Sequence, residues 1–151
     1  GGWIKFVFLP RIDADNVVAR LTMPLGTPVE TAAESVKRLE KSALKLEDEF
    51  NLGRPIVRHV LAAIGEQPSL NRASGPAPAS STFSGSHLGE VDIELTPSEK
   101  RRLSSTVIAN RWRELTGPIP DAVELVFSSS LFTSILSAWK ILLAGFPFLL
   151  P

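Results

Sequence analysis

The sequence contains no cysteine, which removes disulfide bonds, thiolate zinc sites and cysteine nucleophiles from the chemistry open to it. It also has no excess of charge, because 16 Lys and Arg residues balance 16 Asp and Glu residues. A neutral chain has no general attraction to nucleic acid, which is bound through a basic face. These two absences argue against a thiol enzyme and against a nucleic-acid-binding protein.

The sequence also lacks the common catalytic and nucleotide-binding motifs. It has no Walker A sequence, no G-x-G-x-x-G, no H-E-x-x-H and no G-x-S-x-G elbow. His59 and His87 are the only histidines, and without an elbow a Ser-His-Asp triad has no local support. Asp13 and Asp15 flank Ala14 with no third ligand in spacing, so they are interpreted as turn residues. We therefore expect no enzyme activity, no metal site and no cofactor.

The length and composition indicate one globular domain. The chain has 151 residues, of which 44% are hydrophobic and 21% charged, enough for a core of ordinary size. It begins with Gly1-Gly2 and has no starting Met or signal peptide. We expect a piece of a longer protein or a cloning remnant at this end.

Hydrophobic periodicity predicts four strands and two helices. Period-two or dense apolar runs predict strands over 16–23, 56–64, 90–95 and 122–128. Apolar residues at spacings of three and four predict helices that follow Thr27 and Thr96 and end near Phe50 and Leu115. The order βαββαβ is typical of the ferredoxin-like α+β fold, a four-stranded antiparallel sheet with two helices on one face.

The two predicted helices follow the same tetrapeptide pattern, Thr-Pro-x-Glu, at residues 27–30 and 96–99. Each threonine is predicted to cap its helix, with the glutamate reaching back as in a capping box and proline at the first helical position. The repeat places equivalent caps in two βαβ halves, so it is interpreted as a fold signal with no chemical role.

Two segments depart from a plain ferredoxin-like domain, which is predicted over 16–130 after a leading segment 1–15. Residues 65–89 are rich in Gly, Pro, Ser and Ala and predict a long loop where a hairpin needs about 2–5 residues. Residues 131–151 form an apolar tail with Lys140 as its one charge, interrupted by Gly145 and Pro147.

A short basic run, Lys100-Arg101-Arg102, raises the question of RNA binding on such a sheet. RNA-binding versions of the fold present aromatic side chains on the central strands, and these strands carry none apart from Phe127. The run, together with Arg111 and Arg113, is therefore interpreted as a solvated helix face.

The segment "FLPRIDADNVVARLTMPLGTPVETAAESVKRLE", residues 8–40, resembles the resistance-nodulation-division (RND) family of proton-driven efflux transporters. The matching positions follow the family pattern at the start of its second large periplasmic segment, after the seventh transmembrane helix: Phe8, Pro10, Asp15, Pro24, Gly26 and Thr27. The later segment 91–130, with Trp112-Arg113 and Gly-x-Ile-Pro, also resembles the family. The likeness covers about residues 3–131, and the tail departs from it.

The resemblance implies a βαββαβ porter subdomain that helps to form a substrate cleft and does not transport alone. The parent would be an inner-membrane homotrimer with its porter region in the periplasm, working with a periplasmic adaptor and an outer-membrane channel. Its substrates would be hydrophobic or amphiphilic. The family's Gly/Phe-rich substrate loop corresponds in location to 65–89, which makes Phe83 and His87 candidate substrate-binding residues, although Phe83 is the loop's one aromatic residue.

Two other functions stay open at this point. A stand-alone ferredoxin-like module could bind a small molecule or a protein through its sheet or long loop. An enzyme on the same fold is the third candidate, and no catalytic set supports it.

Overall fold

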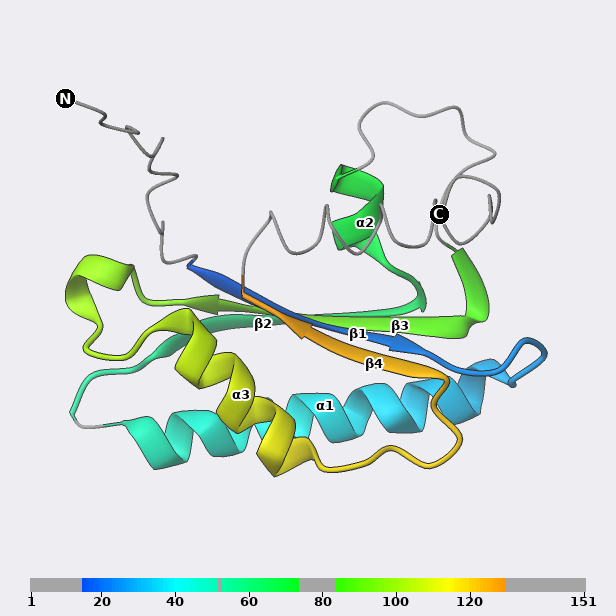
Figure 1. Cartoon of the computed structure of the whole chain (residues 1–151), viewed down its shortest axis with the longest axis horizontal. Helices are drawn as coiled ribbons and strands as arrows, with labels where there is room; N and C mark the ends of the chain where they lie inside the picture. The colour runs from blue at the N-terminus through cyan, green and yellow to red at the C-terminus, as the bar shows by residue number, and fades with distance from the viewer. Residues whose placement is uncertain (1–14, 52, 74–83, 130–151) are drawn as a thin grey trace, which may run out of the picture.

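The computed structural model describes residues 15–51, 53–73 and 84–129. The predictions for the leading segment, for Phe83 and for the tail 131–151 fall outside these residues, apart from Asp15. Along the chain the elements are β1 (Asn16–Thr22), α1 (Val29–Phe50), β2 (Val57–Glu66), α2 (Pro68–Ala73), β3 (Ser84–Leu95), η2 (Ser98–Lys100), α3 (Ser105–Thr116) and β4 (Glu124–Ser128) (Figure 1). Within the described ranges, no helix is long and apolar enough to cross a membrane.

The four strands form one antiparallel sheet in the order β2-β3-β1-β4. Figure 1 shows α1 and α3 together on one face, with the short α2 on the opposite face. This is the ferredoxin-like α+β arrangement, which confirms the fold class that the order of elements predicts.

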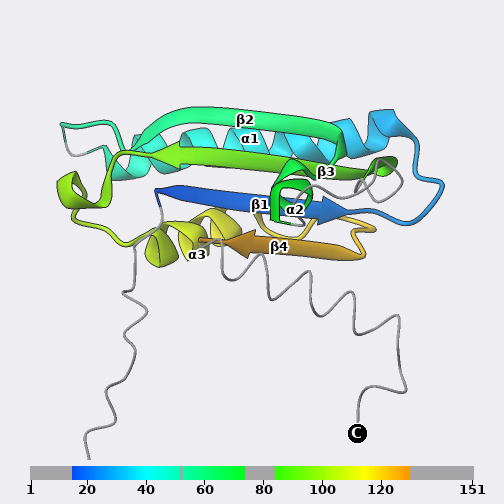
Figure 2. The same cartoon turned by 90° about the horizontal axis from the view of Figure 1, so that it is seen from above.

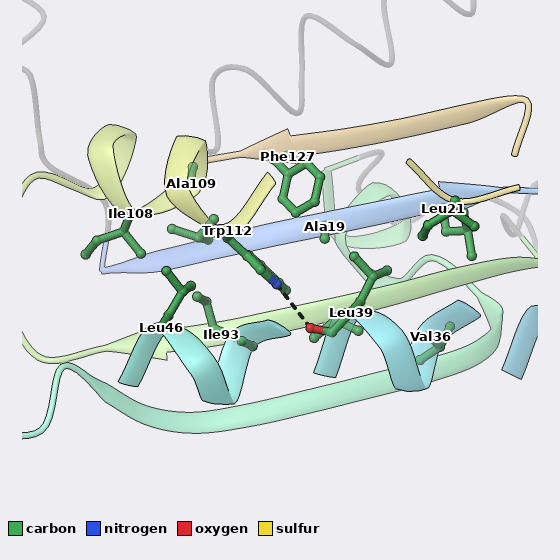
Figure 3. Packing of buried hydrophobic residues seen from close by; sticks show 14 of the residues in the cluster. Ala19, Leu21, Val36, Leu39, Leu46, Ile93, Ile108, Ala109, Trp112 and Phe127 are labelled. Atoms are coloured by element: carbon green, nitrogen blue, oxygen red, sulfur yellow. Dashed lines mark hydrogen bonds between the residues drawn. The ribbon is translucent and has the colours of Figure 1, made fainter. Parts of the chain in front are cut away.

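The core lies between the sheet and the two long helices. Helix α1 contributes a stripe at helical spacing, and β1 and β3 contribute alternate residues on the facing side of the sheet. Trp112 of α3 is fully buried at the centre, and its indole Nε1 donates to the Leu39 carbonyl at 3.1 Å and to Ser42 Oγ at 3.0 Å (Figure 3). Its ring meets Phe127 edge-on, with 5.2 Å between centroids. One side chain therefore joins α3 to both α1 and β4.

Strand β1 is buried on both sides, where its alternating pattern predicts a half-buried strand. Val17, Ala19 and Leu21 face the core, and Val18 and Arg20 on the other side are buried as well. Strand β1 is a central strand of the sheet, with β3 and β4 beside it. Arg20 thus lies between Glu90 of β3 and Val126 of β4.

The prediction of two capping boxes is wrong. Helix α1 starts after Pro28 with no side-chain cap, because the Thr27 hydroxyl donates instead to the Pro24 carbonyl at 2.6 Å. The second tetrapeptide leads into the 3-10 turn η2, and α3 begins only at Ser105. Ser104 is its cap, with Oγ accepting from the Val107 N–H at 3.3 Å. The apolar spacing that predicts the second helix places Val107 on its inward side, but Val107 is 46% exposed.

Much of the segment 65–89, predicted to be a loop, has regular structure. Strand β2 continues to Glu66, α2 occupies part of the segment, and β3 already begins at Ser84. The N-terminal part of β3 is held by further backbone pairing, since the Met23 N–H donates to the His87 carbonyl at 2.8 Å. The hairpin is thus extended beyond the point where Gly- and Ser-rich composition predicts a loop.

Candidate functional site

The sheet face opposite α1 and α3 carries a group of buried polar side chains beside α2. We call this side of the sheet the open face. Because side chains alternate along a strand, Arg20 and Glu90 point away from the core residues that flank them. The register places Arg20 opposite Glu90, and Glu90 opposite Ala63 of β2. Three strands thus meet around one glutamate.

Glu90 fastens α2 to this face. Its carboxylate is almost fully buried and accepts from the Ser69 N–H at 3.0 Å and from Ser69 Oγ at 2.6 Å. Gln67 adds a second attachment, since its Nε2 donates to the Leu21 carbonyl at 2.9 Å. A buried carboxylate is costly unless it is hydrogen-bonded, so these contacts explain how Glu90 is tolerated under α2.

Arg20 is the second buried charge of the open face. It is 4% exposed, and its Nη1 has no hydrogen-bond partner among the described residues. Burial lowers the pKa of Arg20 from its ordinary value, and the nearby carboxylates of Glu90 and Glu124 act in the opposite direction. Arg20 is therefore a desolvated cation held in place by surrounding negative charge.

A shallow pocket of about 190 Å³ opens next to this cluster. Apolar groups and two carboxylates line it: Leu61, Ala62, Ala63, Pro68, Glu90 and Asp92. Ligand pockets that enclose a small molecule are typically about 300–1,000 Å³, so this one is too small to enclose a drug-sized molecule.

The two histidines of the chain lie far apart in the sheet. His87 lies half-buried in β3 near Met23, whereas His59 is exposed in β2 opposite Glu94 at the other end of the sheet. Phe83 is outside the described residues, so substrate contact by Phe83 and His87 stays a prediction. In the described part of the chain, no three His, Asp or Glu side chains form a group that could hold a metal ion.

Asp15 and Arg101, the middle residue of the basic run, have structural roles, whereas Lys100 and Arg102 are exposed. The Asp15 carboxylate accepts from the Ser98 N–H at 2.9 Å and from Arg101 Nη2 at 3.3 Å. The Arg101 side chain is only 2% exposed and also donates to the carbonyls of Thr96 and Leu103. The interpretation of Arg101 as part of a solvated face is wrong, because its guanidinium holds the turn between β3 and α3.

Two arginines on the outer face of α3 also contact other parts of the protein. Arg111 bonds Glu49 of α1 at 2.9 Å and Glu114 at 2.8 Å. Arg113 lies over the Phe127 ring, 5.7 Å from its centroid. These arginines therefore link α3 to α1 and to β4.

Sequence reasoning missed the residues of the open-face cluster: Arg20, Gln67, Ser69 and Glu90. A signal for two of them exists, because a charged residue in the middle of a central strand requires a partner once that strand is buried. Gln67 and Ser69 give no such signal, since α2 lies in a segment whose composition predicts a loop.

Comparison with known proteins identifies a shared fold. No family model matches the chain, and no curated protein matches it. A heavy metal efflux pump shares the fold in its crystal form II, with 20% identity over 87% of this chain and a TM-score of 0.52. Crystal form I of a heavy metal efflux pump gives 18% identity, 86% coverage and a TM-score of 0.51. The present chain spans 12% of each of those chains.

Proposed function

We propose that this chain is part of a porter subdomain of an efflux transporter. It contributes a surface that handles substrate, and it is not an enzyme. The observation that carries the proposal is the shared fold, which extends over 87% of the chain in a heavy metal efflux pump. The sequence resemblance to RND transporters supports it from separate evidence, because it rests on motifs and the fold comparison rests on backbone geometry.

The open face is the proposed substrate wall. The pocket beside α2 joins apolar Leu61 and Pro68 to the carboxylates of Glu90 and Asp92, a surface with both apolar and polar contacts for an amphiphile. Its small volume fits a cleft between two domains, in which this sheet supplies one side. The subdomain alone then binds weakly and transports nothing.

Hydrophobic or amphiphilic compounds are the proposed substrates, in preference to a soft metal ion. Soft metals are bound by thiolate and thioether ligands. The chain has no cysteine, and its single methionine, Met23, is buried in the core at 2% exposure. This segment therefore offers a soft metal ion no thiolate or exposed thioether ligand.

The parent protein in this proposal is an inner-membrane, proton-driven homotrimer whose periplasmic part includes this chain. It would work with a periplasmic adaptor and an outer-membrane channel, and with no nucleic acid. The alternative, a stand-alone binding module, is favoured by the pocket beside α2 taken by itself. The reading frame around the coding segment separates the two: membrane-spanning segments before Gly1 support the transporter, and a start codon there with none supports the module.

A transport assay tests the proposed wall directly. The complete gene is expressed in cells that lack their own efflux pumps, and accumulation of a fluorescent amphiphile is measured. Leu61→Asp on the open face should raise accumulation toward that of cells without the gene, because it places a charge on the apolar wall. Val123→Asp is the matched control, since Leu61 and Val123 are both 68% exposed and Val123 lies outside the pocket. Equal accumulation in the two variants at equal expression would contradict the proposed wall.

A further inference from the structure

Two side chains on the open face are buried away from the attachment of α2. Val18 of β1 and Ser128 of β4 are paired in the sheet, point to this face, and are only 9% and 3% exposed. Helix α2 is fastened further along the strands, at Glu90 and at the Leu21 carbonyl. Figure 2 looks onto this face and shows α2 over β3 and β1, to one side of the end of β4. A further part of the protein therefore covers Val18 and Ser128.

The covered area is limited to the β1–β4 side of the open face. In the row of the sheet that contains Val18 and Ser128, Asp92 of β3 is half-buried and Leu61 of β2 is 68% exposed. Asn16, two residues before Val18 on the same face, is exposed. These exposures are those of one chain without a partner, so the covering segment belongs to this chain.

Arg20 indicates that the covering segment is apolar. It follows Val18 on the same face, lies opposite Val126 of β4, and is 4% exposed. Water does not reach a side chain so deeply buried, and Arg20 Nη1 has no hydrogen-bond partner in the described part of the chain. A polar segment would offer acceptors to a guanidinium N–H, which is rarely left unpaired. An apolar segment accounts for both observations, because it excludes water and offers few acceptors.

Three stretches of the chain lie outside the described ranges, apart from the single position 52, and two of them fit this place poorly. Residues 74–83 connect α2 to the start of β3, at the opposite end of the sheet, and they are rich in Gly, Pro, Ser and Ala. Residues 1–14 carry charges at positions 5, 11 and 13, and they lead into Asp15 and Asn16, which are both exposed.

The third stretch, residues 130–151, fits in both position and composition. It continues from Ser129, which is half-buried and directly follows the buried Ser128. Residues 131–151 are nearly all apolar, with Lys140 as their one charge, and such a run is unfavourable in water unless it is covered. The chain therefore leaves β4 beside the surface that is covered.

We propose that residues 131–151 dock on the open face of their own domain, over β1 and β4, and cover Val18, Arg20 and Ser128. Docking removes the apolar segment and this part of the sheet from water together. It leaves the pocket beside α2 open, because Leu61 on the β2 side stays exposed. The accessible part of the open face is thereby narrowed to β2 and β3. The docking does not depend on the proposed transport function.

Thiol accessibility in the full chain tests the docking. The chain has no cysteine of its own, so Ser128→Cys introduces the only thiol, and its rate of reaction with a small maleimide is measured under native conditions. Ser42→Cys is the matched control, because Ser42 is also 3% exposed but lies between α1 and α3, where its Oγ is 2.7 Å from Thr116 Oγ1. Both thiols should react at least about a hundredfold more slowly than that of Leu61→Cys.

Charges placed in residues 131–151 should then uncover the open face. Leu131→Asp/Ile135→Asp should raise the reaction rate of Ser128→Cys by about tenfold or more, because an unpaired charge is unfavourable in an apolar contact. The rate of Ser42→Cys should not change. Ile4→Asp/Leu9→Asp places the same two substitutions in the leading segment and should alter neither rate.

Four results would each overturn the proposal. The first is a fast reaction of Ser128→Cys in the otherwise unchanged chain, and the second is no change in its rate with the charges in residues 131–151. The third is an equal or larger rise with the charges in the leading segment, which would assign the cover to residues 1–14. The fourth is an equal rise for Ser128→Cys and Ser42→Cys, which would show that residues 131–151 maintain the whole fold instead of covering one face.

Discussion

The two βαβ halves of this domain carry the same tetrapeptide pattern and use it differently. In the first half, Thr-Pro-x-Glu leads directly into α1, a helix of 22 residues. In the second half it forms η2, after which the chain bends and α3 begins at Ser105 with 12 residues. A local pattern therefore does not by itself fix where a helix begins.

The difference comes from contacts with distant residues. The Thr27 hydroxyl bonds within its own turn, to the Pro24 carbonyl, and the chain continues as a helix after Pro28, although the Thr27 carbonyl accepts from Ser86 Oγ at 3.0 Å. Thr96 is engaged by the other half, because its N–H donates to the Ile56 carbonyl at 2.8 Å and its hydroxyl donates to the Pro55 carbonyl at 2.7 Å. Thr96 is thus fixed beside the start of β2, and the helix forms only where Ser104 supplies a cap.

Among the variants that compare the two halves, Trp112→Ala in the second half should have the largest effect on stability. This change removes the side chain that joins α3 to α1 and β4, and it leaves a cavity in the core. The free energy of unfolding should fall by about 3–5 kcal/mol, measured by urea denaturation. Val107→Ala on the same helix is the control and should cost under about 0.5 kcal/mol, because Val107 is half exposed. Similar losses in both variants would show that Trp112 does not hold the halves together.

An intermediate effect should come from Gly89→Ala, at the contact between β3 and α1. A Cβ at Gly89 would lie 2.5 Å from Val36 Cγ2, so the halves would be forced apart locally. We expect a loss of about 1–3 kcal/mol in the free energy of unfolding. The double variant Gly89→Ala/Val36→Ala should lose less than the sum of the two single variants, by at least about 0.5 kcal/mol. Strict additivity would indicate that no close contact exists there.

The smallest losses of stability should come from variants at the two helix starts, and they should differ between the two. Ser104→Ala removes the cap of α3 and should cost about 1 kcal/mol of unfolding free energy. Thr27→Ala removes an exposed hydroxyl bond that caps no helix, and its cost should be smaller. Thermal unfolding of the two variants at matched concentration gives the order. A larger loss for Thr27→Ala would mean that this threonine acts as a cap in solution.

Most of the fold could be predicted from periodicity. The stripe on α1 and the alternation in β1 and β3 place Val36, Leu39 and Ile93 in the core, as the structure does. Strand order then follows from the βαββαβ sequence of elements, since few topologies connect it without crossing. The ends of β2, β3 and α3 could not be predicted, because cross-strand pairing extends strands past Gly- and Ser-rich residues and a distant contact delays the second helix.

The candidate site was much less predictable than the fold. A triad search draws attention to His59 and His87, and the strands hold these residues apart at opposite ends of the sheet. The cluster that does form depends on Ser69 reaching Glu90, which lies 21 residues away along the chain. A contact between residues so far apart produces no periodic pattern in a single sequence.

By itself the sequence determined the order of the four strands and two long helices and the core face of the first helix and the central strands, because spacing along a strand or helix dictates which side chains share a face. Only the tertiary structure decided that Arg20 and Glu90 are buried and that α2 lies across the open face. Burial of a charge depends on which remote segment lies beside it, and that is a property of the assembled sheet.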